Sequence, residues 1–414
     1  MQADSSNLIS CSNPVVDEWL RALAGRRGAF SALLAAAEKD APAGFENTVR
    51  EICQQPATWT ETARHLMAFR TVMAEGVAAC RRVVLTGSGS SQYAGECVAP
   101  VLEQKLQRSV SVAGGGDLLL GRSASVAGEP TLAVSLARSG ESPESAAVVE
   151  TLLETEPQTR HLIITCNSDG KLATRFAGNP RVSVVPLGEE VNDRSLVMTS
   201  SFTNLVLGAR FLGWLDRTDE FAADVDRLSY AGREFLKTWP DCLADVVSGD
   251  LERIVFLGDG SRFGAAREAS LKLLEMTAGR IATMAQTYLG LRHGPMCFIN
   301  ERTLVVCFLS ADPLIRRYQN DLISELNSKR LGARKLFAGV GNPAEGLSHD
   351  RDLVIPYMLP NQASDGELAL LDVMIAQILG FHRCRTEGLQ PDSPSINGII
   401  SRVVGEFGIH RPEE

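Results

Sequence analysis

The 414-residue chain lacks several features that mark particular classes of protein. Its nine cysteines are odd in number and widely spaced, with no C-x-x-C pair, so we expect neither a disulfide framework nor a zinc site. No uncharged apolar run reaches the ~18 residues that a membrane span needs. The N-terminal MQADSSNLIS lacks the basic-then-apolar order of a signal peptide. Together these absences predict a cytoplasmic protein with no membrane partner.

The chain also lacks an excess of positive charge. Lys and Arg number 41 against 50 Asp and Glu, which gives a net charge of −9. This balance argues against nucleic acid and anionic membrane surfaces as partners, although a local pocket can still bind a small anion. With 44% apolar and 22% charged residues, the chain resembles a globular protein with a buried core. Its length suggests two or three domains of roughly 100–200 residues each.

The strongest organisational signal is an internal repeat of β-rich runs in the same order. Continuous β-branched runs that end in Gly, Ser or Asn are typical of strands buried on both faces of a parallel sheet. Helix-like stretches lie between them, at Ser145–Leu153 and Ala265–Thr277. The pattern predicts an α/β fold with two doubly wound parallel-sheet domains, at 52–220 and at 221–414 including a C-terminal tail. The paired runs are RVVLTGSGS (82–90) with RIVFLGDGS (253–261), TLAVSLA (131–137) with TLVVCFL (303–309), and, more loosely, HLIITCN (161–167) with LFAGVGN (336–342).

Residues 1–51 are predicted to form an N-terminal helical segment. Asn13–Lys39 is expected to be helical, with Pro14 in its first turn. We expect this helix to pack on the domains, and the alternative is a DNA-reading helix-turn-helix, which the acidic chain disfavours. Its apolar side would consist of Trp19, Leu20, Leu23, Leu33 and Leu34.

Two serine-rich loops follow the first two repeated runs. Such loops at the carboxyl ends of parallel strands suit a phosphate group, because small residues let the backbone approach and helix N-termini present free N–H groups. Ser142 is expected at an N-cap, followed by a proline. The alternative is two ordinary serine-rich turns. The candidate phosphate-binding residues are Ser88, Gly89, Ser90, Ser91, Arg138, Ser139 and Ser142.

Known nucleotide motifs are missing from these loops. The chain has no GxxxxGK[ST], and no GxGxxG with an acidic residue at the right distance, so neither an NTP nor a dinucleotide site is expected. The second repeat carries Asp259 in its first loop and Ser310-Ala311-Asp312-Pro313 in its second. Since Asp259 would repel phosphate, we expect one phosphate site per chain.

Candidate residues for proton transfer lie in the second half. Glu268, Lys272 and Glu275 fall within about 60° of one another on a helix, with apolar residues on both sides, so this polar stripe should face a pocket or be internally paired. The alternative is a simple Glu268–Lys272 pair, which would leave Glu275 without a partner. His293, in Arg292-His293-Gly294-Pro295, is placed for proton transfer near neutral pH, although a lone loop histidine is often structural.

These residues permit the isomerisation of a sugar phosphate. The phosphate would anchor the substrate away from the reacting carbons, a histidine would open the ring, and a carboxylate would carry a proton between C2 and C1. No metal-ligand cluster is visible in the sequence, so we expect no metal and no cofactor.

Several motifs together resemble the tandem SIS (sugar isomerase) proteins, and more narrowly their AgaS branch of galactosamine-6-phosphate deaminase/isomerases and tagatose-6-phosphate ketose/aldose isomerases. The resemblance runs from about Glu51 to His410. It rests on SGESPES (139–145), ITCN (164–167), DRSLVMTSS (193–201), AREASLKLLEMTAG (266–279), RHGP (292–295) and the tail at 401–404.

The resemblance also implies site residues. By position, Ser88, Ser90, Ser91, Ser139 and Ser142 would hold the phosphate. Glu275 would move the C1/C2 proton, Lys272 would lie beside the sugar, and Val197 and Thr199 would touch it. His293 would assist ring opening from the partner subunit, which implies a homodimer with shared active sites.

The chain departs from the related glucosamine-6-phosphate synthases at two points. It begins Met1-Gln2-Ala3 where those enzymes need an N-terminal cysteine nucleophile, and its last lysine is Lys335, so it lacks their Schiff-base lysine near the C-terminus. We therefore expect an amino-sugar deaminase that converts galactosamine 6-phosphate to tagatose 6-phosphate and ammonia, as in N-acetylgalactosamine utilisation. The alternatives are a ketose/aldose isomerase without deamination and a non-catalytic SIS protein that senses a sugar phosphate.

Overall fold

Two parallel five-stranded sheets form the framework of the computed structural model, which describes residues 13–37, 43–121, 126, 128–405 and 407–410. The first sheet has the order β2-β1-β3-β4-β5, and the second has the equivalent order β7-β6-β8-β9-β10. This confirms the predicted α/β fold and its duplication. The first sheet consists of β1 (Arg82–Gly87), β2 (Ser109–Gly114), β3 (Thr131–Ala137), β4 (Thr159–Thr165) and β5 (Val182–Pro186), and the second of β6 (Arg253–Leu257), β7 (Ala282–Gln286), β8 (Thr303–Phe308), β9 (Arg334–Val340) and β10 (Leu353–Tyr357).

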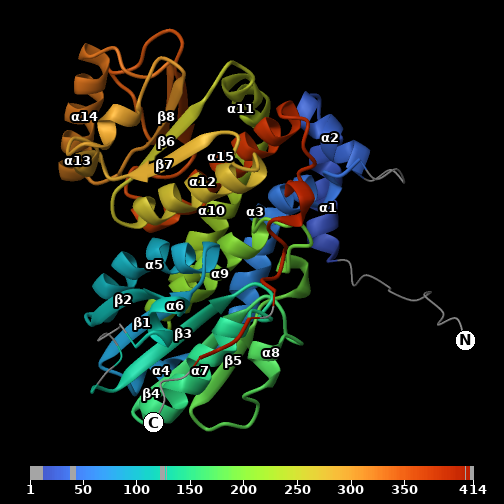
Figure 1. Cartoon of the computed structure of the whole chain (residues 1–414), viewed down its shortest axis with the longest axis vertical. Coiled ribbons are helices and arrows are strands. Elements are labelled where there is room, and N and C mark those ends of the chain that lie inside the picture. Colours follow the sequence, from blue (N-terminus) through green and yellow to red (C-terminus); the bar gives the residue numbers. More distant parts are fainter. Residues whose placement is uncertain (1–12, 38–42, 122–125, 127, 406, 411–414) are drawn as a thin grey trace, which may run out of the picture.

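Helices cover both sheets, and Figure 1 shows a helical layer between the two sheets. Within this layer α5 packs on α12, the corresponding helix of the other copy, while α9 and α15 pack beside them. The remaining helices lie around this framework. The helices of the two copies are α5 (Ser90–Leu106), α6 (Gly115–Leu119), α7 (Pro143–Thr155), α8 (Lys171–Thr174) and α9 (Ser200–Arg210), then α11 (Pro240–Val247), α12 (Ser261–Met276), α13 (Tyr288–Leu291), α14 (Pro313–Ser328) and α15 (Asp365–Thr386), with α4 (Arg70–Ala78) before β1 and α10 (Thr218–Thr238) between the copies.

The first loop of each copy has the same backbone shape. Gly89, before α5, has φ 56° and ψ −126°, and Gly260, before α12, has φ 54° and ψ −130°. A positive φ is strained for residues with a Cβ atom, so glycine is the suitable residue at both turns. The two copies therefore share the turn that begins the helix and differ only in the side chains around it.

The two copies are joined by close helix packing. A Cβ atom on Gly264 of α12 would lie 2.6 Å from the backbone nitrogen of Cys97 on α5, which is too close for any larger residue without a shift of the backbone. One hydrophobic cluster runs through this contact and includes residues from both copies. The copies thus share a core.

The N-terminal segment is made of three helices, α1 (Pro14–Ala24), α2 (Ala29–Ala37) and α3 (Glu46–Leu66). The prediction of a single helix at Asn13–Lys39 is wrong. The first helix ends at Ala24 and the next begins at Ala29, and Gly28 between them has φ 143°. Asn13 caps α1 as expected, accepting from the N–H of Val15 at 3.0 Å. Residues 38–39 lie outside the described residues.

This segment packs on the domains. Trp19 is buried, and its indole N–H donates to the carbonyl of Cys53 on α3 at 2.8 Å. Val16, Leu20 and Leu23 join the shared core. The domain boundaries stay predictions; α3 runs through residue 51, and α10 begins at Thr218.

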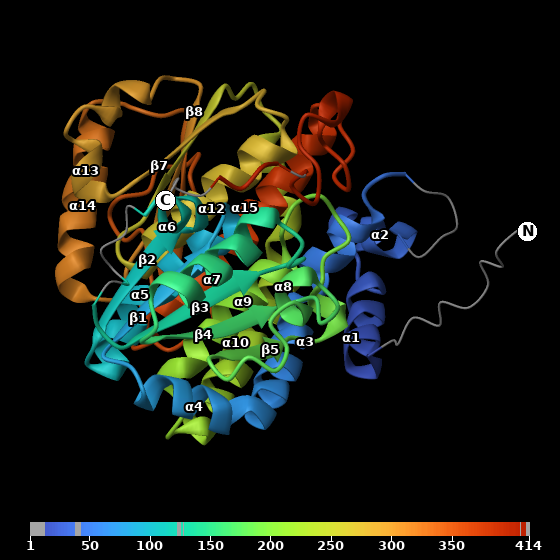
Figure 2. The ribbon, with the colours of Figure 1, turned by 60° about the horizontal axis from the view of Figure 1, so that its bottom comes forward.

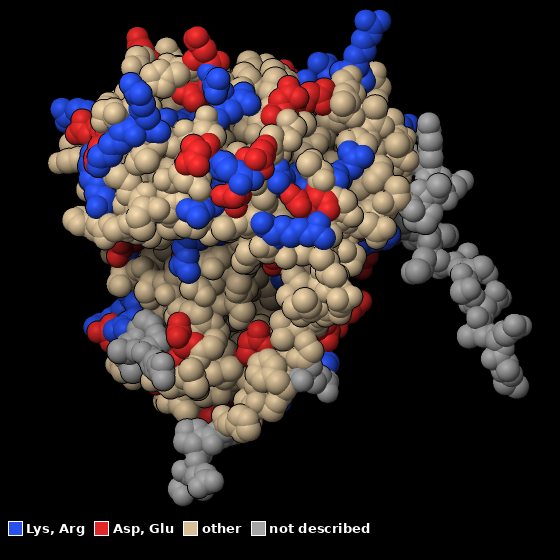
Figure 3. Space-filling view, turned by 45° about the horizontal axis from the view of Figure 1, so that its top comes forward, with Lys and Arg blue, Asp and Glu red and all other residues tan. Residues whose placement is uncertain are grey.

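The C-terminal segment returns to the first copy. After α15 it runs across the first sheet's side of the molecule (Figure 1, red). The N-terminal helices α1 and α2 lie beside α3 at one side of the molecule (Figure 2). On the face shown in Figure 3, Lys and Arg side chains are interspersed with Asp and Glu. Among the described residues, no helix is both long and apolar enough to span a bilayer.

Candidate active site

A cavity of about 470 Å³ lies at the carboxyl ends of β1 and β3. Four parts of the chain form its walls: the two serine-rich loops of the first copy, the segment with Leu196 and Met198, one face of α12 from the second copy, and the C-terminal strap, which we define as residues 396–405. The cavity therefore joins residues that lie far apart in the sequence. All seven predicted phosphate-binding residues line it, namely Ser88, Gly89, Ser90, Ser91, Arg138, Ser139 and Ser142, together with Lys272 and Glu275.

The first loop presents hydroxyl groups at the start of α5. Ser90 is the first residue of that helix, after the Gly89 turn, so the loop lies at the N-terminal end of α5. The N–H of Ser91 donates to the carbonyl of Ser88 at 3.2 Å. Ser88 is exposed, whereas Ser90 and Ser91 are buried at the base of the cavity. An anion here would meet hydroxyl and N–H donors and the positive end of a helix.

The second loop places Ser139 and Ser142 on the adjacent strand end. Ser142 occupies the N-cap position of α7, followed by Pro143, as predicted. Its side chain makes no capping hydrogen bond, so its hydroxyl is not committed to the helix. The hydroxyl of Ser139 accepts from the N–H of Glu141 at 3.3 Å.

Arg138 lines the cavity, but its guanidinium binds backbone carbonyls. Nη1 donates to Leu196 at 2.9 Å, and Nη2 donates to Arg402. Arg138 thereby ties the strap to the first copy. A contact between Arg138 and a phosphate stays a prediction.

The polar residues on one face of α12, Glu268, Lys272 and Glu275, form ion pairs with one another, and two of them line the cavity. Lys272 Nζ lies 2.6 Å from Glu275 Oε2 and 3.4 Å from Glu268 Oε1. Both alternatives weighed from the sequence are thus partly right: the Glu268–Lys272 pair exists, and Glu275 also has Lys272 as its partner. Glu268 and Lys272 are fully buried, while the Glu275 side chain is 22% exposed and faces the cavity.

Burial and charge shift the pKa of two of these groups. Burial raises the pKa of Glu268 to about 7, an effect that Lys272 partly offsets and Glu275 strengthens. For Lys272 burial acts to lower the pKa, but the carboxylates of Glu268 and Glu275 outweigh it, so the pKa is raised. Lys272 is therefore a fixed cation beside Glu275.

The C-terminal strap forms the outer wall. Arg402 anchors it, donating from Nε to the carbonyl of Asp193 and from Nη2 to Oδ1 of Asn192, both at 2.7 Å. Ile399, Ile400 and Val404 of the strap are exposed and line the cavity.

Three predicted residues lie away from the cavity wall. Val197 and Thr199 are buried, and the neighbouring side chains of Leu196 and Met198 line the cavity instead. His293 is exposed at the turn after α13 and does not line the cavity. Contacts of these three residues with a sugar stay predictions.

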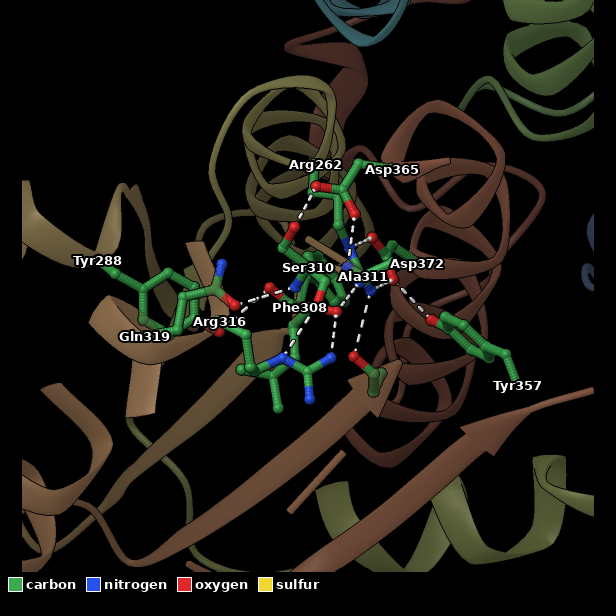
Figure 4. A network of polar contacts seen from close by, with 12 residues as sticks. Arg262, Tyr288, Phe308, Ser310, Ala311, Arg316, Gln319, Tyr357, Asp365 and Asp372 are labelled. Carbon is green, nitrogen blue, oxygen red and sulfur yellow. Dashed lines mark hydrogen bonds and ion pairs between the residues drawn. The ribbon is translucent and has the colours of Figure 1, made fainter. Parts of the chain in front are cut away.

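The corresponding cradle of the second copy is filled by the protein's own groups (Figure 4). The carboxylate of Asp365 accepts from the hydroxyl of Ser310 at 2.5 Å and from the N–H of Ala311 at 3.0 Å. Beside it, Arg262 forms a buried ion pair with Asp372 at 2.5 Å. An internal carboxylate thus takes donors that an anionic ligand would need, which agrees with the expectation of one phosphate site per chain.

Known proteins resemble this chain over most of its length. The SIS domain family matches residues 77–202. An AgaS protein of Streptomyces coelicolor is 37% identical over 88% of this chain and 95% of its own length. The D-galactosamine-6-phosphate deaminase AgaS of Escherichia coli is 32% identical, with 88% and 95% of the two chains covered.

The chain belongs to the AgaS family of SIS-domain proteins. A solved structure named tagatose-6-phosphate ketose/aldose isomerase, from Escherichia coli, matches it with a TM-score of 0.76 and 30% identity, covering 86% of this chain and 97% of that one. The fold and the resemblance expected from the sequence motifs are both confirmed.

Sequence reasoning missed two parts of the site. It did not predict that the strap closes the cavity, although the tail at 401–404 carried part of the family resemblance. It also did not connect Glu268 with the phosphate loop, although Ser90 donates to Glu268 at 3.1 Å. Among the described residues, no group of three or more His, Cys, Asp and Glu side chains could hold a metal ion.

Proposed function

We propose that this chain converts galactosamine 6-phosphate and water into tagatose 6-phosphate and ammonia. The observation that carries the proposal is one cavity in which the serine loops of the first copy face Lys272 and Glu275 of the second. The names of the AgaS relatives support the substrate.

The proposed roles follow from the positions of the groups. The phosphate would bind to the hydroxyl and N–H groups of the loops at Ser88–Ser91 and Ser139–Ser142, which would hold the reacting carbons near α12. Ring opening moves a proton from the anomeric hydroxyl to the ring oxygen, and we assign this step to His293 of a second subunit. The exposed position of His293, away from its own cavity, supports this assignment.

Glu275 would then act on the open chain. The substrate carries an ammonium group at C2. As the Glu275 carboxylate removes the C2 proton, O1 takes a proton from this ammonium group, which gives a neutral 2-amino-enol. The protonated Glu275 then returns the C2 proton to C1. The product is an iminium at C2, to which water adds before ammonia leaves, so the sequence is redox-neutral. Lys272, as a fixed cation 2.6 Å from Glu275, would hold the carboxylate in place and stabilise negative charge on the substrate oxygen.

Incubation with galactosamine 6-phosphate tests the proposal, with ammonia and ketose 6-phosphate measured together. We expect equal amounts of the two products in the wild type and none with Glu275→Gln. Absence of ammonia from galactosamine and glucosamine 6-phosphates alike would refute deamination, and full activity of Glu275→Gln would refute the proton-transfer role.

A second candidate function is isomerisation without deamination. The name of the Escherichia coli structural neighbour favours it. Turnover of tagatose 6-phosphate to galactose 6-phosphate, without activity on amino sugars, would support this candidate. Binding of sugar phosphates without any turnover would instead indicate a non-catalytic sensor.

The proposal includes a homodimer with shared active sites, a cytoplasmic location, and a hydrolytic reaction that needs no metal, within N-acetylgalactosamine utilisation. Activity should therefore survive treatment with EDTA. Light scattering should give the mass of a dimer.

A further inference from the structure

A chain of polar contacts connects the phosphate loop with the proton-transfer residues. Ser90 is buried at the base of the cavity, and its hydroxyl donates to Glu268 Oε1 at 3.1 Å. Glu268 is fully buried on α12, and its other oxygen, Oε2, has no hydrogen-bond partner. Lys272 lies between Glu268 and Glu275. The contacts therefore run from one copy to the other without a gap.

Ser90 is the point at which a phosphate would enter this chain of contacts. A serine hydroxyl has one proton and donates one hydrogen bond at a time. If Ser90 donates to a phosphate oxygen, Glu268 loses that hydrogen bond and faces an additional anion across the cavity wall. A buried carboxylate that loses a donor and gains a negative neighbour binds a proton more strongly.

We propose that Glu268 is a positioning residue that takes up a proton when an anion fills the phosphate loop, and that this proton releases Lys272 toward Glu275 and the sugar. The inference rests on the proposed function for the identity of the phosphate loop. It adds a coupling: Lys272 is shared between two carboxylates in the empty site, and it pairs with Glu275 alone when the 6-phosphate is in place.

Among the buried groups next to the phosphate loop, we expect Glu268 to be the one that changes its protonation state near neutral pH. Burial raises the pKa of Glu268 to about 7, so a further increase lies within the range of ordinary buffers. Burial also raises the pKa of Cys97, on α5, well above its usual value, so Cys97 stays a neutral thiol. The charged groups that act on the pKa of Glu268 are Lys272 and Glu275, on α12 itself. The neighbouring charges are paired with one another: Glu96 on α5 with Arg267, and Asp372 on α15 with Arg262.

Sulfate is a suitable probe because it resembles a phosphate ester but carries no proton of its own between pH 5 and 9. Calorimetric titration of the full-length protein with sulfate, at pH 7.5 in buffers of different ionisation enthalpy, gives the number of protons taken up. We expect uptake of up to one proton in the wild type. The sulfate Kd should then rise by up to tenfold between pH 7 and pH 8.

Three variants test which side chain takes up the proton when sulfate binds. Glu268→Gln should bind sulfate without proton uptake and without this pH dependence. Ser90→Ala should reduce the uptake, because Glu268 already lacks its donor before the anion arrives. Glu144→Gln is the matched control: Glu144 is another carboxylate on the cavity wall, in the first turn of α7, and its removal should leave the uptake unchanged.

The outcomes separate the coupling from the proposed function. Sulfate binding without proton uptake in the wild type, or unchanged uptake in Glu268→Gln, overturns the coupling and leaves the deaminase proposal standing. Loss of the uptake in Glu144→Gln alone also overturns it. Failure of sulfate to bind the wild type overturns the coupling together with the phosphate anchor. If Glu268→Gln does not fold, the result with Ser90→Ala decides.

Discussion

Replacing Lys272 with methionine removes the cation that lies between Glu268 and Glu275. Lys272 is fully buried, and so is Glu268, so the substitution leaves a buried carboxylate without its counter-charge. Removing one partner of a buried ion pair costs about 3–5 kcal/mol. We expect Lys272→Met to lower the free energy of unfolding by that amount at pH 8, measured by urea denaturation, and to abolish turnover.

The loss in the free energy of unfolding caused by Lys272→Met should depend on pH. The pKa of Glu268 is raised to about 7 in the folded protein, above its ordinary value, so its contribution to stability is fully present below the unfolded pKa and is lost as the pH rises through about 7. Without Lys272 this pKa rises further, because the group that lowers it is gone. The loss of stability in Lys272→Met should therefore be smaller at pH 5.5, where Glu268 is protonated, than at pH 8.

Lys329→Met is the matched control. Lys329 pairs with Glu325 at 2.6 Å and the same four-residue spacing, but both side chains are substantially exposed. Such a pair contributes about 0.5 kcal/mol or less. The double variant Glu268→Gln with Lys272→Met should regain part of the lost stability. Equal losses in the two lysine variants, or a loss in Lys272→Met that does not change with pH, would refute the reasoning.

Three other substitutions test separate parts of the site. Ser139→Ala should lower kcat/KM at least about tenfold, the lower end of the value of a hydrogen bond to a charged group, and an unchanged value would remove Ser139 from the phosphate site. If His293 serves the neighbouring subunit's cavity, co-refolding inactive Glu275→Gln with inactive His293→Asn should restore about a quarter of wild-type activity, whereas no recovery would place both residues in one subunit's site. Gly264→Ala should lower both the urea midpoint and activity, because its Cβ atom would lie 2.6 Å from the backbone of Cys97; an unchanged midpoint would contradict the close packing of α5 on α12.

The fold could be predicted because its signals are local. Continuous β-branched runs such as TLAVSLA at 131–137, each followed by a turn, indicate buried parallel strands without knowledge of distant contacts. The serine loops could be placed for the same reason, since strand ends of a parallel sheet meet at one edge. The break in the N-terminal helix was missed, although Gly25 and Gly28 are visible in the sequence.

The rest of the site depends on contacts between distant segments. Helical periodicity put Glu268, Lys272 and Glu275 on one face of a helix, but nothing in that pattern says which cavity the face lines. The answer comes from the packing of α12 on α5, which a glycine at 264 permits. The course of the strap is likewise set by Arg402 and Arg138 binding carbonyls far away in the chain.

The packing of α5 on α12 has a consequence for substrate length. α5 begins at the phosphate loop, and α12 carries Glu275, so the close packing of the two helices sets the separation between the anchored phosphate and the carboxylate. This separation determines how many carbons can lie between the phosphate and the atom that reaches Glu275. A hexose 6-phosphate that brings C2 to Glu275 would, if shortened by one carbon, bring a different atom there. The chain should therefore discriminate sugars by the number of carbons between phosphate and carbonyl, before any hydroxyl group is recognised.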